Sequence, residues 1–338
     1  MSSAAIRTVI PSDEPALAVL ANRVVDGGAV AFTRRRHVPF LDAEGPESVG
    51  FIAETRSGEV VGAAWVRIGR CRLFGSPSAY ALLHSLSVAP DARRRGVATA
   101  LTNARLAWVD AQSDARGEVI VPIATIQHGN TASLANTRRW ATVISDELRV
   151  TPVPVRRRPP RARPEWRVHD GNDLPAADDA PGLGPDTAPR LLSDWLERSV
   201  GGERMNHLHV LTDRSGTVLA ALGIHDDTPL SHLQVVRMPA SIALANRFVR
   251  VVGGDGAMRT GQVTLAWARD QAAGRYLWQH VRWRWHPRLT SLVTTVDPTD
   301  PSAAMTKAPR WLPATRIHLA ARLPNGQQRL PGPIRLPL

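Results

Sequence analysis

The strongest chemical signal in the chain is a basic, glycine-containing segment at the expected start of a helix. Residues 90–98 read PDARRRGVA, so three arginines precede Gly96. The first turn of a helix presents unpaired N–H groups and a partial positive charge, and glycine lets the backbone approach an anion closely. The segment therefore predicts a phosphate cradle. It has neither the Gly-Lys-Ser/Thr ending of a Walker loop nor the Gly-x-Gly-x-x-Gly spacing of a dinucleotide-binding fingerprint.

The pattern Arg/Gln-x-x-Gly-x-Gly/Ala, after a strand that ends in Val-Ala-Pro, resembles the acyl-CoA signature of the GNAT superfamily of N-acetyltransferases. In that family, backbone amides of the loop hold the CoA pyrophosphate, and the preceding strand pairs with pantetheine. An asparagine at the start of the next helix forms a second cofactor element. The resemblance therefore implies acetyl-CoA, or another acyl-CoA, as the cofactor, and no metal. It assigns cofactor binding to Leu86, Ser87, Val88, Arg93, Arg94, Arg95, Gly96, Val97, Ala98, Thr99, Asn130 and Ser133.

Acyl transfer to an amine requires the attacking nitrogen to be neutral. An alkyl amine of pKa about 10 is neutral in only about one part in 10³ at neutral pH, so a base or a desolvating pocket assists the reaction. His84 lies four residues before Val88, where many members of the family carry a catalytic Glu. Histidine is a suitable general base near neutral pH. The alternative is a strand histidine that is hydrogen-bonded in the cleft.

The resemblance also implies a general-acid Tyr seven residues after Asn130. This sequence has Thr137 at that position, and neither Tyr80 nor Tyr276 matches it. A thiol of pKa about 8.5 leaves with little help from an acid, and backbone N–H groups where strands splay apart can stabilise the oxyanion. Thr137 therefore weakens the expectation of standard catalysis and leaves the expectation of CoA binding intact.

Length and composition are typical of a globular protein with two domains. Domains usually contain roughly 100–200 residues, and this chain has 338, of which 43% are hydrophobic. No apolar run approaches the roughly 18 residues that span a bilayer, and the first residues lack the pattern of a secretory signal. Cys71 is the only cysteine, which excludes an internal disulfide and a cysteine-based zinc site. We therefore expect a cytoplasmic protein.

The chain is strongly basic, with a formal net charge of +12 and a pI of about 11.3. Such a balance is compatible with a polyanionic partner such as nucleic acid or an anionic membrane. Lys307 is the only lysine, however, so the arginine excess also fits GC-rich codon usage, and the aromatic interleaving of single-strand binders is absent. We expect a small-molecule amine as the partner, with no membrane and no nucleic acid, and leave a homodimer open.

Alternating strand and helix patterns surround the basic segment. Apolar and β-branched runs predict strands at 6–10, 51–54, 60–68, 81–88 and 119–126. Helices are expected after the acidic, proline-containing start at 12–15, from residue 97 onward, and over 131–140. This order, with the resemblance, implies an α/β (α+β) fold in which helices flank a mixed, mostly antiparallel central sheet.

The second half of the chain repeats features of the first half in the same order, which indicates internal duplication. The matched features are RSGEVVGAA at 56–64 with RSGTVLAA at 214–221, Arg93-x-x-Gly96 with Gln271-x-x-Gly274, Asn130 with Asp300, and Trp140 with Trp311. We therefore expect two tandem GNAT domains, at 1–154 and 165–338. The Pro- and Arg-rich segment 155–164 is expected to be a solvated linker, and the second copy has an extra helix near 242–252.

The second copy of the loop is more degenerate than the first. Gln271 and Gly274 form a candidate second cofactor site, but Tyr276 occupies the place of a small residue. The tyrosine either blocks the pyrophosphate or lies outside the cradle. Elsewhere, His207 and His209 share one face of a strand and could pair on a metal. No third ligand is evident, so core or surface positions are the favoured interpretation.

Together these features predict an acyl-CoA-dependent N-acyltransferase that acts on the amine of a small metabolite. The length and the arginine bias are similar to those of tandem members of the family from actinomycete antibiotic gene clusters, including the clavulanic acid cluster. A non-catalytic acyl-CoA-binding sensor or scaffold is the alternative, favoured by the missing Tyr and the altered second loop. Nucleic-acid binding is a third interpretation, and which domain carries turnover stays open.

Overall fold

In a computed structural model the chain folds as two compact units. The N-unit combines residues 1–147 with Arg316–Leu330, and the C-unit is built from residues 148–315. The structure describes residues 4–23, 26–27, 30–45, 47–73, 76–170, 199–200, 203–297, 304–306, 308, 312–324, 326–327 and 330. The expected fold class is confirmed, because helices flank mixed, mostly antiparallel sheets.

The N-unit is built on a mixed sheet in which β6 and β7 are parallel and the other neighbouring strands are antiparallel. Along the sheet the order is β1 (Ala5–Thr8), β4 (Ser48–Glu54), β5 (Val60–Leu73), β6 (Ser76–Val88), β7 (Ile120–Gln127) and β19 (Thr315–Ala321). The short strand β8 (Val143–Ile144) also pairs with β19, and β2 (Asp26–Gly27) pairs with β3 (Ala31–Arg36) outside this sheet.

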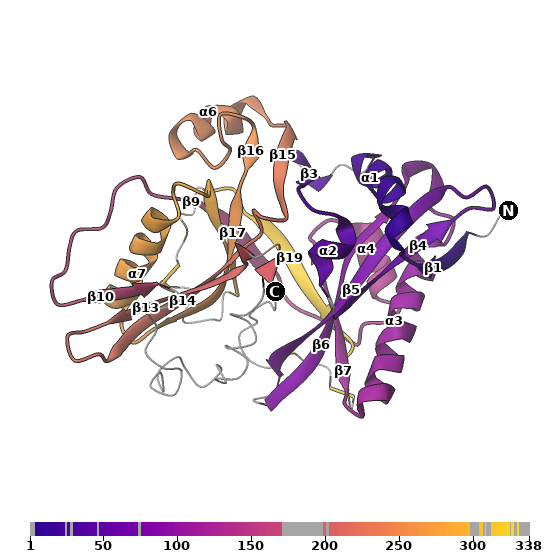
Figure 1. Cartoon of the computed structure of the whole chain (residues 1–338), viewed down its shortest axis with the longest axis horizontal. Coiled ribbons are helices and arrows are strands. Elements are labelled where there is room, and N and C mark those ends of the chain that lie inside the picture. The colour runs from indigo at the N-terminus through magenta and orange to yellow at the C-terminus, as the bar shows by residue number, and fades with distance from the viewer. Residues whose placement is uncertain are drawn as a thin grey trace. The chain divides into compact units, whose positions relative to one another are not determined.

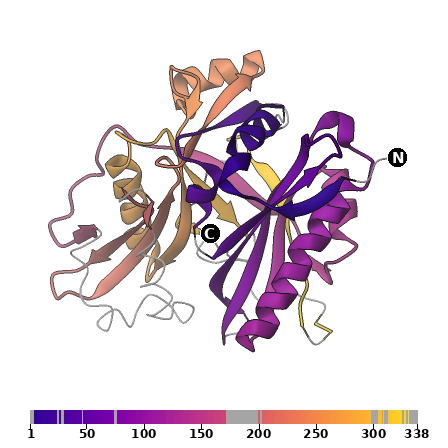
Figure 2. The same ribbon diagram turned by 45° about the vertical axis from the view of Figure 1, so that its right-hand side comes forward.

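Helices cover both faces of the N-unit sheet. They are η1 (Pro11–Asp13), α1 (Glu14–Arg23), α2 (Phe40–Glu44), η2 (Pro90–Ala92), α3 (Val97–Arg116) and α4 (Thr131–Thr137). Gly62 of β5 lets α3 pack closely, since a Cβ there would lie 2.9 Å from Val97 Cγ1 and 3.1 Å from Leu101 Cδ1. Ala63 points to the opposite face, which α1 covers with the buried Leu17. Figures 1 and 2 show α3 running along β5, β6 and β7.

A buried carboxylate fixes the start of α1. Arg7 of β1 donates to both oxygens of Asp13, at 2.8 Å each, and its Nε donates to Glu54 of β4 at 2.7 Å. The backbone N–H of Ile10 donates to the same Asp13 carboxylate at 2.9 Å. The hydrogen bonds from Arg7 are the main cause that lowers the pKa of Asp13 below its usual 3.8.

The C-unit has its own mixed sheet, in which β17 and β18 are parallel and the other neighbours are antiparallel. Its order is β9 (Leu148–Pro154), β18 (Ser291–Val296), β17 (Thr260–Ala268), β14 (Val218–Asp226), β13 (Asn206–Thr212) and β10 (Arg167–Asp170). Helix α7 (Gln271–Arg284) connects the parallel pair and buries Leu277 and Val281 in the core. Outside this sheet lie β11 (Ser199–Val200), β12 (Glu203–Arg204), β15 (Ser231–Arg237), α6 (Ala240–Val249) and β16 (Ala257–Met258).

The two units share an order of elements. In the N-unit β4, β5, β6, α3 and β7 occur in this order. In the C-unit β13, β14, β17, α7 and β18 occur in the corresponding order with the same pattern of antiparallel and parallel pairs, and β15, α6 and β16 are inserted between β14 and β17. The two Arg-Ser-Gly turns occupy matching hairpins, with Gly58 at φ 84° and Gly216 at φ 86°. The sequence repeat at these turns therefore corresponds to matching positions in the two units.

Strand pairing divides the chain differently from the continuous ranges 1–154 and 165–338. Strand β9 pairs with β18 of the C-unit, and β19 pairs with β7 of the N-unit. The segment 155–164 lies wholly in the C-unit, where the N–H of Arg156 donates to the carbonyl of Arg282 at 3.0 Å. Pairing between strands that are distant in the chain leaves no local sequence pattern, which is why continuous ranges were expected.

The expected strands and helices of the first half are present, with their ends shifted by a few residues. The extra helix near 242–252 is α6. No helix in the described ranges is long and apolar enough to cross a membrane. The correspondences that involve Asp300 and Trp311 lie outside the described residues.

We expect Asp13→Asn to lower the free energy of unfolding by about 1–2 kcal/mol near neutral pH, because a charged hydrogen-bond partner of Arg7 is lost. The folded-state pKa of Asp13 is depressed, so the stabilisation is present above pH 3.8 and is lost as the pH falls through the folded-state pKa. Urea unfolding of both proteins from about pH 7 to about pH 3 should show a difference that narrows with acidification.

The control is Asp91→Asn, which removes an exposed ion pair with Arg23, 2.9 Å long. It should change the stability by less than about 1 kcal/mol. A difference between wild type and Asp13→Asn that persists at the lowest pH would show that the carboxylate charge is not what stabilises the start of α1.

Candidate functional site

The N-unit sheet opens where β6 leaves β7. The two strands pair in parallel only through residues 79–82 and 120–123, whereas β6 continues to Val88 and β7 to Gln127. On its other edge, β7 pairs with β19 over residues 123–127. One edge of β6 is therefore turned toward an opening, and an extended ligand could pair with its backbone there. The segment 86–88, which was expected to contact pantetheine, lies on this edge.

A β-bulge lies at the start of the opening. Two residues of β6, Ser85 and Leu86, oppose the single residue Ala64 of β5. Ser85 has a φ of 50°, a left-handed conformation that is uncommon for any residue except glycine. A bulge bends its strand and increases the local twist. The bulge therefore sets the direction of the last residues of β6.

Arg105 of α3 holds this bulge from the core. Its Nη1 donates to the carbonyls of Trp65 and His84, at 3.3 Å each, and its Nη2 donates to Thr102 Oγ1 at 3.1 Å. Asn136 of α4 donates to the same Thr102 oxygen at 2.8 Å. Arg105 is only 3% exposed, and its burial lowers the pKa to about 10, so it is still charged at neutral pH. One buried guanidinium thus ties β5 and β6 to α3.

The basic segment forms a tight connection from β6 into α3. Arg94 has a φ of 62°, and Gly96, the N-cap of α3, has a φ of 83°. Successive N–H groups in such turns form a concave nest that favours anions. Among the described residues no side chain caps the first turn of α3. The N–H groups of residues 97–99, which have no partner within the helix, are therefore suited to bind an anion.

The side chains of this loop are arranged around the same turn. All three arginines are exposed, and Arg93 Nε donates to the carbonyl of Val88 at 3.2 Å, which joins the loop to the end of β6. No described atom lies within 4 Å of the position that a Cβ of Gly96 would occupy. The geometry expected of residues 93–99 as an anion cradle is therefore present.

Two residues of the expected site, Asn130 and Thr137, lie at the two ends of α4. Asn130 is the N-cap of α4, and its Oδ1 accepts a hydrogen bond from the N–H of Ser133 at 3.0 Å. Thr137, at the position of the family's general-acid Tyr, is buried with 5% exposure. Its neighbour Asn136 contacts α3 through Thr102. Thr137 is thus enclosed by the protein at the end of α4, and its role in catalysis stays a prediction.

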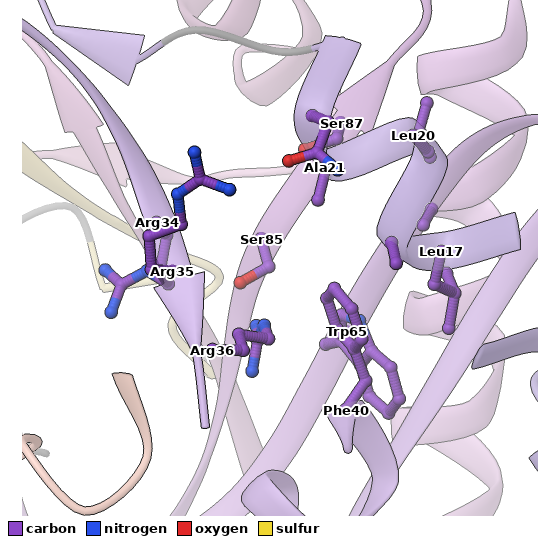
Figure 3. Close-up of a pocket in the computed structure, with 13 residues that line it drawn as sticks. Leu17, Leu20, Ala21, Arg34, Arg35, Arg36, Phe40, Trp65, Ser85 and Ser87 are labelled. Carbon is purple, nitrogen blue, oxygen red and sulfur yellow. The ribbon is translucent and has the colours of Figure 1, made fainter. Parts of the chain in front are cut away.

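A cavity of about 300 Å³ lies on the α1 face of the sheet, beside the bulge. Its walls come from α1, β3, Phe40 and the adjoining parts of β5 and β6. Figure 3 shows Arg34 and Arg35 on one side, Leu17 and Leu20 on the other, and Ser85 between them. A row of three arginines gives this wall a strongly positive potential.

Aromatic side chains line the cavity next to the arginines. The ring of Phe40 stacks on Trp65, with centroids 6.4 Å apart and planes inclined by 9°. The guanidinium carbon of Arg36 lies 3.9 Å from the centroid of the Phe40 ring, a cation–π contact. Trp65 is 2% exposed, so the stack joins the core to the cavity wall. The cavity therefore combines an apolar surface with fixed positive charge.

His84 connects this cavity with a buried carboxylate. His84 Nε2 lies 3.2 Å from Glu44 Oε2 of α2, and His84 Nδ1 lies 3.1 Å from Ser85 Oγ. The distance to Glu44 is that of an ion pair, but Nε2 does not meet the angular requirement of a hydrogen bond. Ser85, but not His84, lines the cavity. The order carboxylate, imidazole, hydroxyl leads from the interior to the cavity wall.

Glu44 remains ionised despite its burial. Burial by itself raises the pKa of this carboxyl group, but contact with His84 and the charges of Arg36 and Arg67 outweigh it, so that the net pKa is lowered. A buried carboxylate beside an imidazole orients the ring and stabilises the imidazolium form. His84 thus has a partner that suits a proton-accepting residue, which a purely structural histidine does not require.

The second loop differs from the first in its geometry, which corrects the expectation of a second cradle at Gln271 and Gly274. Both residues lie inside the first turn of α7. The carboxylate of Asp270 caps this helix by accepting from the N–H groups of Ala272 and Ala273, at 2.8 Å each. A Cβ on Gly274 would lie 2.9 Å from the Cβ of Ala268. The first-turn amides are thus bonded to an anionic side chain, and Gly274 is packed against β17.

Other residues that stood out in the sequence serve the C-unit core. The Tyr276 ring packs edge-on against Trp166, with centroids 5.0 Å apart. His209 accepts a hydrogen bond from Trp285 Nε1 at 2.9 Å and contacts Asp170 at 2.7 Å, whereas His207 bonds to the carbonyl of Arg204 at 3.0 Å. The two histidines have separate protein partners, which agrees with their interpretation as core residues.

Four features of the site were missed in the sequence. Glu44 and Ser85 carried no pattern of their own, because their relation to His84 arises only in the fold. The run Arg34–Arg36 was visible as a cluster of charge. Arg105 lies four residues after the buried Leu101 on the apolar face of α3, and an arginine at such a position is a signal for buried acceptors.

Comparison with known proteins supports the same family. The model of the acetyltransferase (GNAT) family matches residues 25–139, about a third of the chain, which contain β3, the arginine loop, α3 and α4. A search of curated protein sequences found no match. The matched segment contains the opening of the sheet, the bulge and most of the cavity wall.

Solved structures show the same fold over most of the chain. N-myristoyltransferase of Saccharomyces cerevisiae with bound myristoyl-CoA superposes with a TM-score of 0.60 at 9% identity, over 95% of this chain and 83% of that one. A glucosamine N-acetyltransferase region of a fungal β-N-acetylglucosaminidase has a TM-score of 0.60 at 14% identity, over 95% and 38%. A GCN5-related N-acetyltransferase from Sphaerobacter thermophilus has a TM-score of 0.50 at 15% identity, over 94% and 95%. These likenesses establish the fold.

We expect Arg105→Met to lower the free energy of unfolding by at least about 2 kcal/mol, because two buried carbonyls at the bulge lose their donor. The control Arg116→Met removes an arginine from the same helix whose exposed side chain contacts Glu47 and Gln112, and should cost less than about 1 kcal/mol. Urea denaturation of the three proteins checks this. Equal losses in the two variants would show that Arg105 does not support the bulge.

Proposed function

We propose that the chain is an acyl-CoA-dependent N-acyltransferase, with acetyl-CoA as the favoured donor, that acts on the amine of a small anionic metabolite. The observation that carries the proposal is the convergence of three features at the end of β6. These are the uncapped first turn of α3, the edge where β6 leaves β7, and the arginine-lined cavity beside Ser85. The GNAT-family match over residues 25–139 supports the same reaction.

The cofactor site would use the backbone more than side chains. The N–H groups at the start of α3 and the left-handed turns at Arg94 and Gly96 suit a pyrophosphate, and the edge of β6 over 86–88 suits the amides of pantetheine. A bound acyl-CoA supplies the acyl group as a thioester, whose thiol of pKa about 8.5 is a good leaving group. Backbone N–H groups at the bulge are donors for the developing oxyanion.

The acceptor would enter the cavity on the α1 face. At about 300 Å³ the cavity is at the small end of ligand pockets, which suits a metabolite. Arg34, Arg35 and Arg36 favour an acceptor that carries a carboxylate or phosphate in addition to its amine. An amino-acid-derived metabolite fits this description. We also propose that the reaction belongs to antibiotic biosynthesis, and only the sequence resemblance supports this step.

The chain Glu44–His84–Ser85 would remove the proton from the amine. With its proton on Nε2, 3.2 Å from Glu44 Oε2, His84 can accept the Ser85 hydroxyl proton at Nδ1 while Ser85 Oγ accepts the proton of the attacking amine. The imidazolium that results forms an ion pair with the Glu44 carboxylate. This relay places the base function at Ser85 on the cavity wall, with His84 behind it.

A second candidate is a non-catalytic acyl-CoA-binding protein. The observation that favours it is the buried Thr137 at the position of the family's acidic Tyr, together with the Asp270 cap that occupies the helix start in the C-unit. Both candidates predict one CoA site for each chain. They differ in whether CoA is released when amines are supplied.

One prediction of this proposal concerns the affinity for acetyl-CoA. A Cβ at a left-handed position costs about 1–2 kcal/mol, so in Gly96→Ala the loop should relax away from the cradle, and acetyl-CoA should bind about five- to thirtyfold more weakly. Isothermal titration calorimetry measures the affinity, and native mass spectrometry should count one CoA per wild-type chain. The matched control is Gly216→Ala, since Gly216 has a φ of 86° in the C-unit hairpin and equally open space around it. Similar affinity losses in both variants would argue against the cradle.

Another prediction of this proposal concerns the Glu44–His84–Ser85 relay. His84→Ala and Ser85→Ala should each lower kcat by about 10²–10⁴-fold, the usual contribution of general base catalysis, and leave acetyl-CoA affinity unchanged. Glu44→Gln should lower kcat by a smaller factor, because the ring loses its charged partner. CoA release with a panel of amino acids and other anionic amines, measured as a function of pH, checks this.

Glu47→Gln is the control for Glu44→Gln, because Glu47 is an exposed carboxylate that only pairs with Arg116. An unchanged rate and pH profile in His84→Ala would remove the relay but not the acyltransferase assignment. Tight acetyl-CoA binding by the wild type without CoA release on any amine would favour the non-catalytic alternative.

A further inference from the structure

Three side chains that can ligate a metal meet in the N-unit, and none of them belongs to the proposed Glu44–His84–Ser85 relay. His128 follows β7, Glu147 follows β8, and His318 lies on β19 opposite Ile126. One ligand atom from each of His128, Glu147 and His318 lies within 4.8 Å of the others. His128 and His318 are 190 positions apart in the chain. Two imidazoles and one carboxylate are a ligand set that first-row divalent metals, zinc above all, bind in proteins.

The hydrogen bond behind His318 is the second observation that indicates a ligand. His318 Nδ1 lies 3.0 Å from the carbonyl oxygen of Ser145. A carbonyl only accepts, so Nδ1 carries the proton and Nε2 presents its lone pair to the other two residues. Metal-ligating histidines in proteins almost always donate their second ring N–H in this way, which fixes both the tautomer and the ring orientation. The N–H of Leu319 donates to Ser145 Oγ at 2.9 Å, which holds Ser145 itself in place.

The distances fit a compact metal site. Ligands about 2.0–2.2 Å from a tetrahedral zinc ion lie roughly 3.3 Å from one another. His128 Nδ1 and His318 Nε2 are 3.4 Å apart, and His128 Nδ1 and Glu147 Oε1 are 2.7 Å apart. The second distance is now that of a hydrogen bond, so metal binding must lengthen it and displace the proton from His128 Nδ1. The side chains of His128 and Glu147 are 46% and 34% exposed, so an ion can reach them from solvent.

Arg316 modulates the carboxylate without occupying the ligand atom. Its Nη1 donates to Glu147 Oε2 at 3.0 Å, whereas Oε1 is the oxygen that faces His128. This hydrogen bond fixes the position of the carboxylate and leaves Oε1 on the side of His128. The guanidinium also repels a cation and competes for the carboxylate. Its removal should therefore strengthen metal binding, whereas removal of a ligand should weaken it.

We propose that His128, Glu147 and His318 form a binding site for a divalent transition metal, with zinc as the best-matched ion and a water molecule as the fourth ligand. No metal was expected from the sequence, and the proposed metal site is independent of the acyltransferase assignment. The ion would fasten β19 to the ends of β7 and β8, since the three elements each supply one ligand. Metal binding would therefore stabilise the N-unit by mass action.

The test uses the full chain without a polyhistidine tag, freed of metal with a chelator. Titration with Co²⁺, followed by its visible d–d absorption, should reach one ion per chain with the strong bands of a four-coordinate site, and Zn²⁺ should displace it. Zn²⁺ should also raise the thermal midpoint. His128→Gln, Glu147→Gln and His318→Asn should each weaken binding at least about tenfold. The control His37→Ala, an exposed histidine before α2, should bind as the wild type does.

Arg316→Gln provides a prediction of opposite sign, with binding tightened about two- to fivefold, the usual strength of an exposed ion pair. His128→Gln is the decisive variant, because its exposed side chain can be replaced without loss of folding. Failure of the wild type to bind Co²⁺ or Zn²⁺ overturns the proposal. So does binding that His128→Gln leaves unchanged, since the ion would then lie elsewhere.

Discussion

The buried guanidinium of Arg105 is the interaction on which the proposed site depends. Strand β6 must leave β7, bend at a bulge and place Ser85 in a left-handed conformation, and each of these steps turns backbone carbonyls away from the sheet. A carbonyl without a partner in the core costs about as much as a lost hydrogen bond. Arg105 supplies the donors for two of them and is itself held on α3. Burying the charge of Arg105 costs free energy, and the hydrogen bonds to these carbonyls offset that cost where the sheet opens.

The first turns of α3, α4 and α7 differ in what binds their free N–H groups, although α3 and α7 occupy corresponding positions in the two units. The first turn of α4 is capped by Asn130 and that of α7 by the carboxylate of Asp270, whereas α3 begins at Gly96, which has no side chain to offer. An anionic cap neutralises the partial positive charge of a helix start, and an uncapped glycine leaves it for a ligand. This difference of one residue supports a division of labour in which the N-unit holds the cofactor.

Two histidine–carboxylate pairs of the N-unit have surroundings that suit different kinds of chemistry. Glu44 is buried, and His84 lies between it and the cavity, so the pair can accept a proton from a substrate. Glu147 and His128 are half exposed, and a second imidazole faces them with its lone pair. The same two residue types thus suggest proton transfer in one place and metal ligation in the other. Burial and the identity of the third partner decide between them.

The sequence by itself determined what depends on neighbouring residues: the strand–loop–helix order around 84–99, the glycine at the N-cap of α3, and the hairpin turns at Gly58 and Gly216. These are local, because hydrogen bonds within a turn or a helix join residues a few positions apart. Tertiary structure alone decided the pairing of β19 with β7, the contact of Glu44 with His84, and the meeting of His128 with His318. Such contacts join segments distant in the chain, so their strength comes from a geometry that no sequence spacing records. The spacing of Gln271 and Gly274 likewise did not show that Asp270 caps α7 and bonds its first-turn amides.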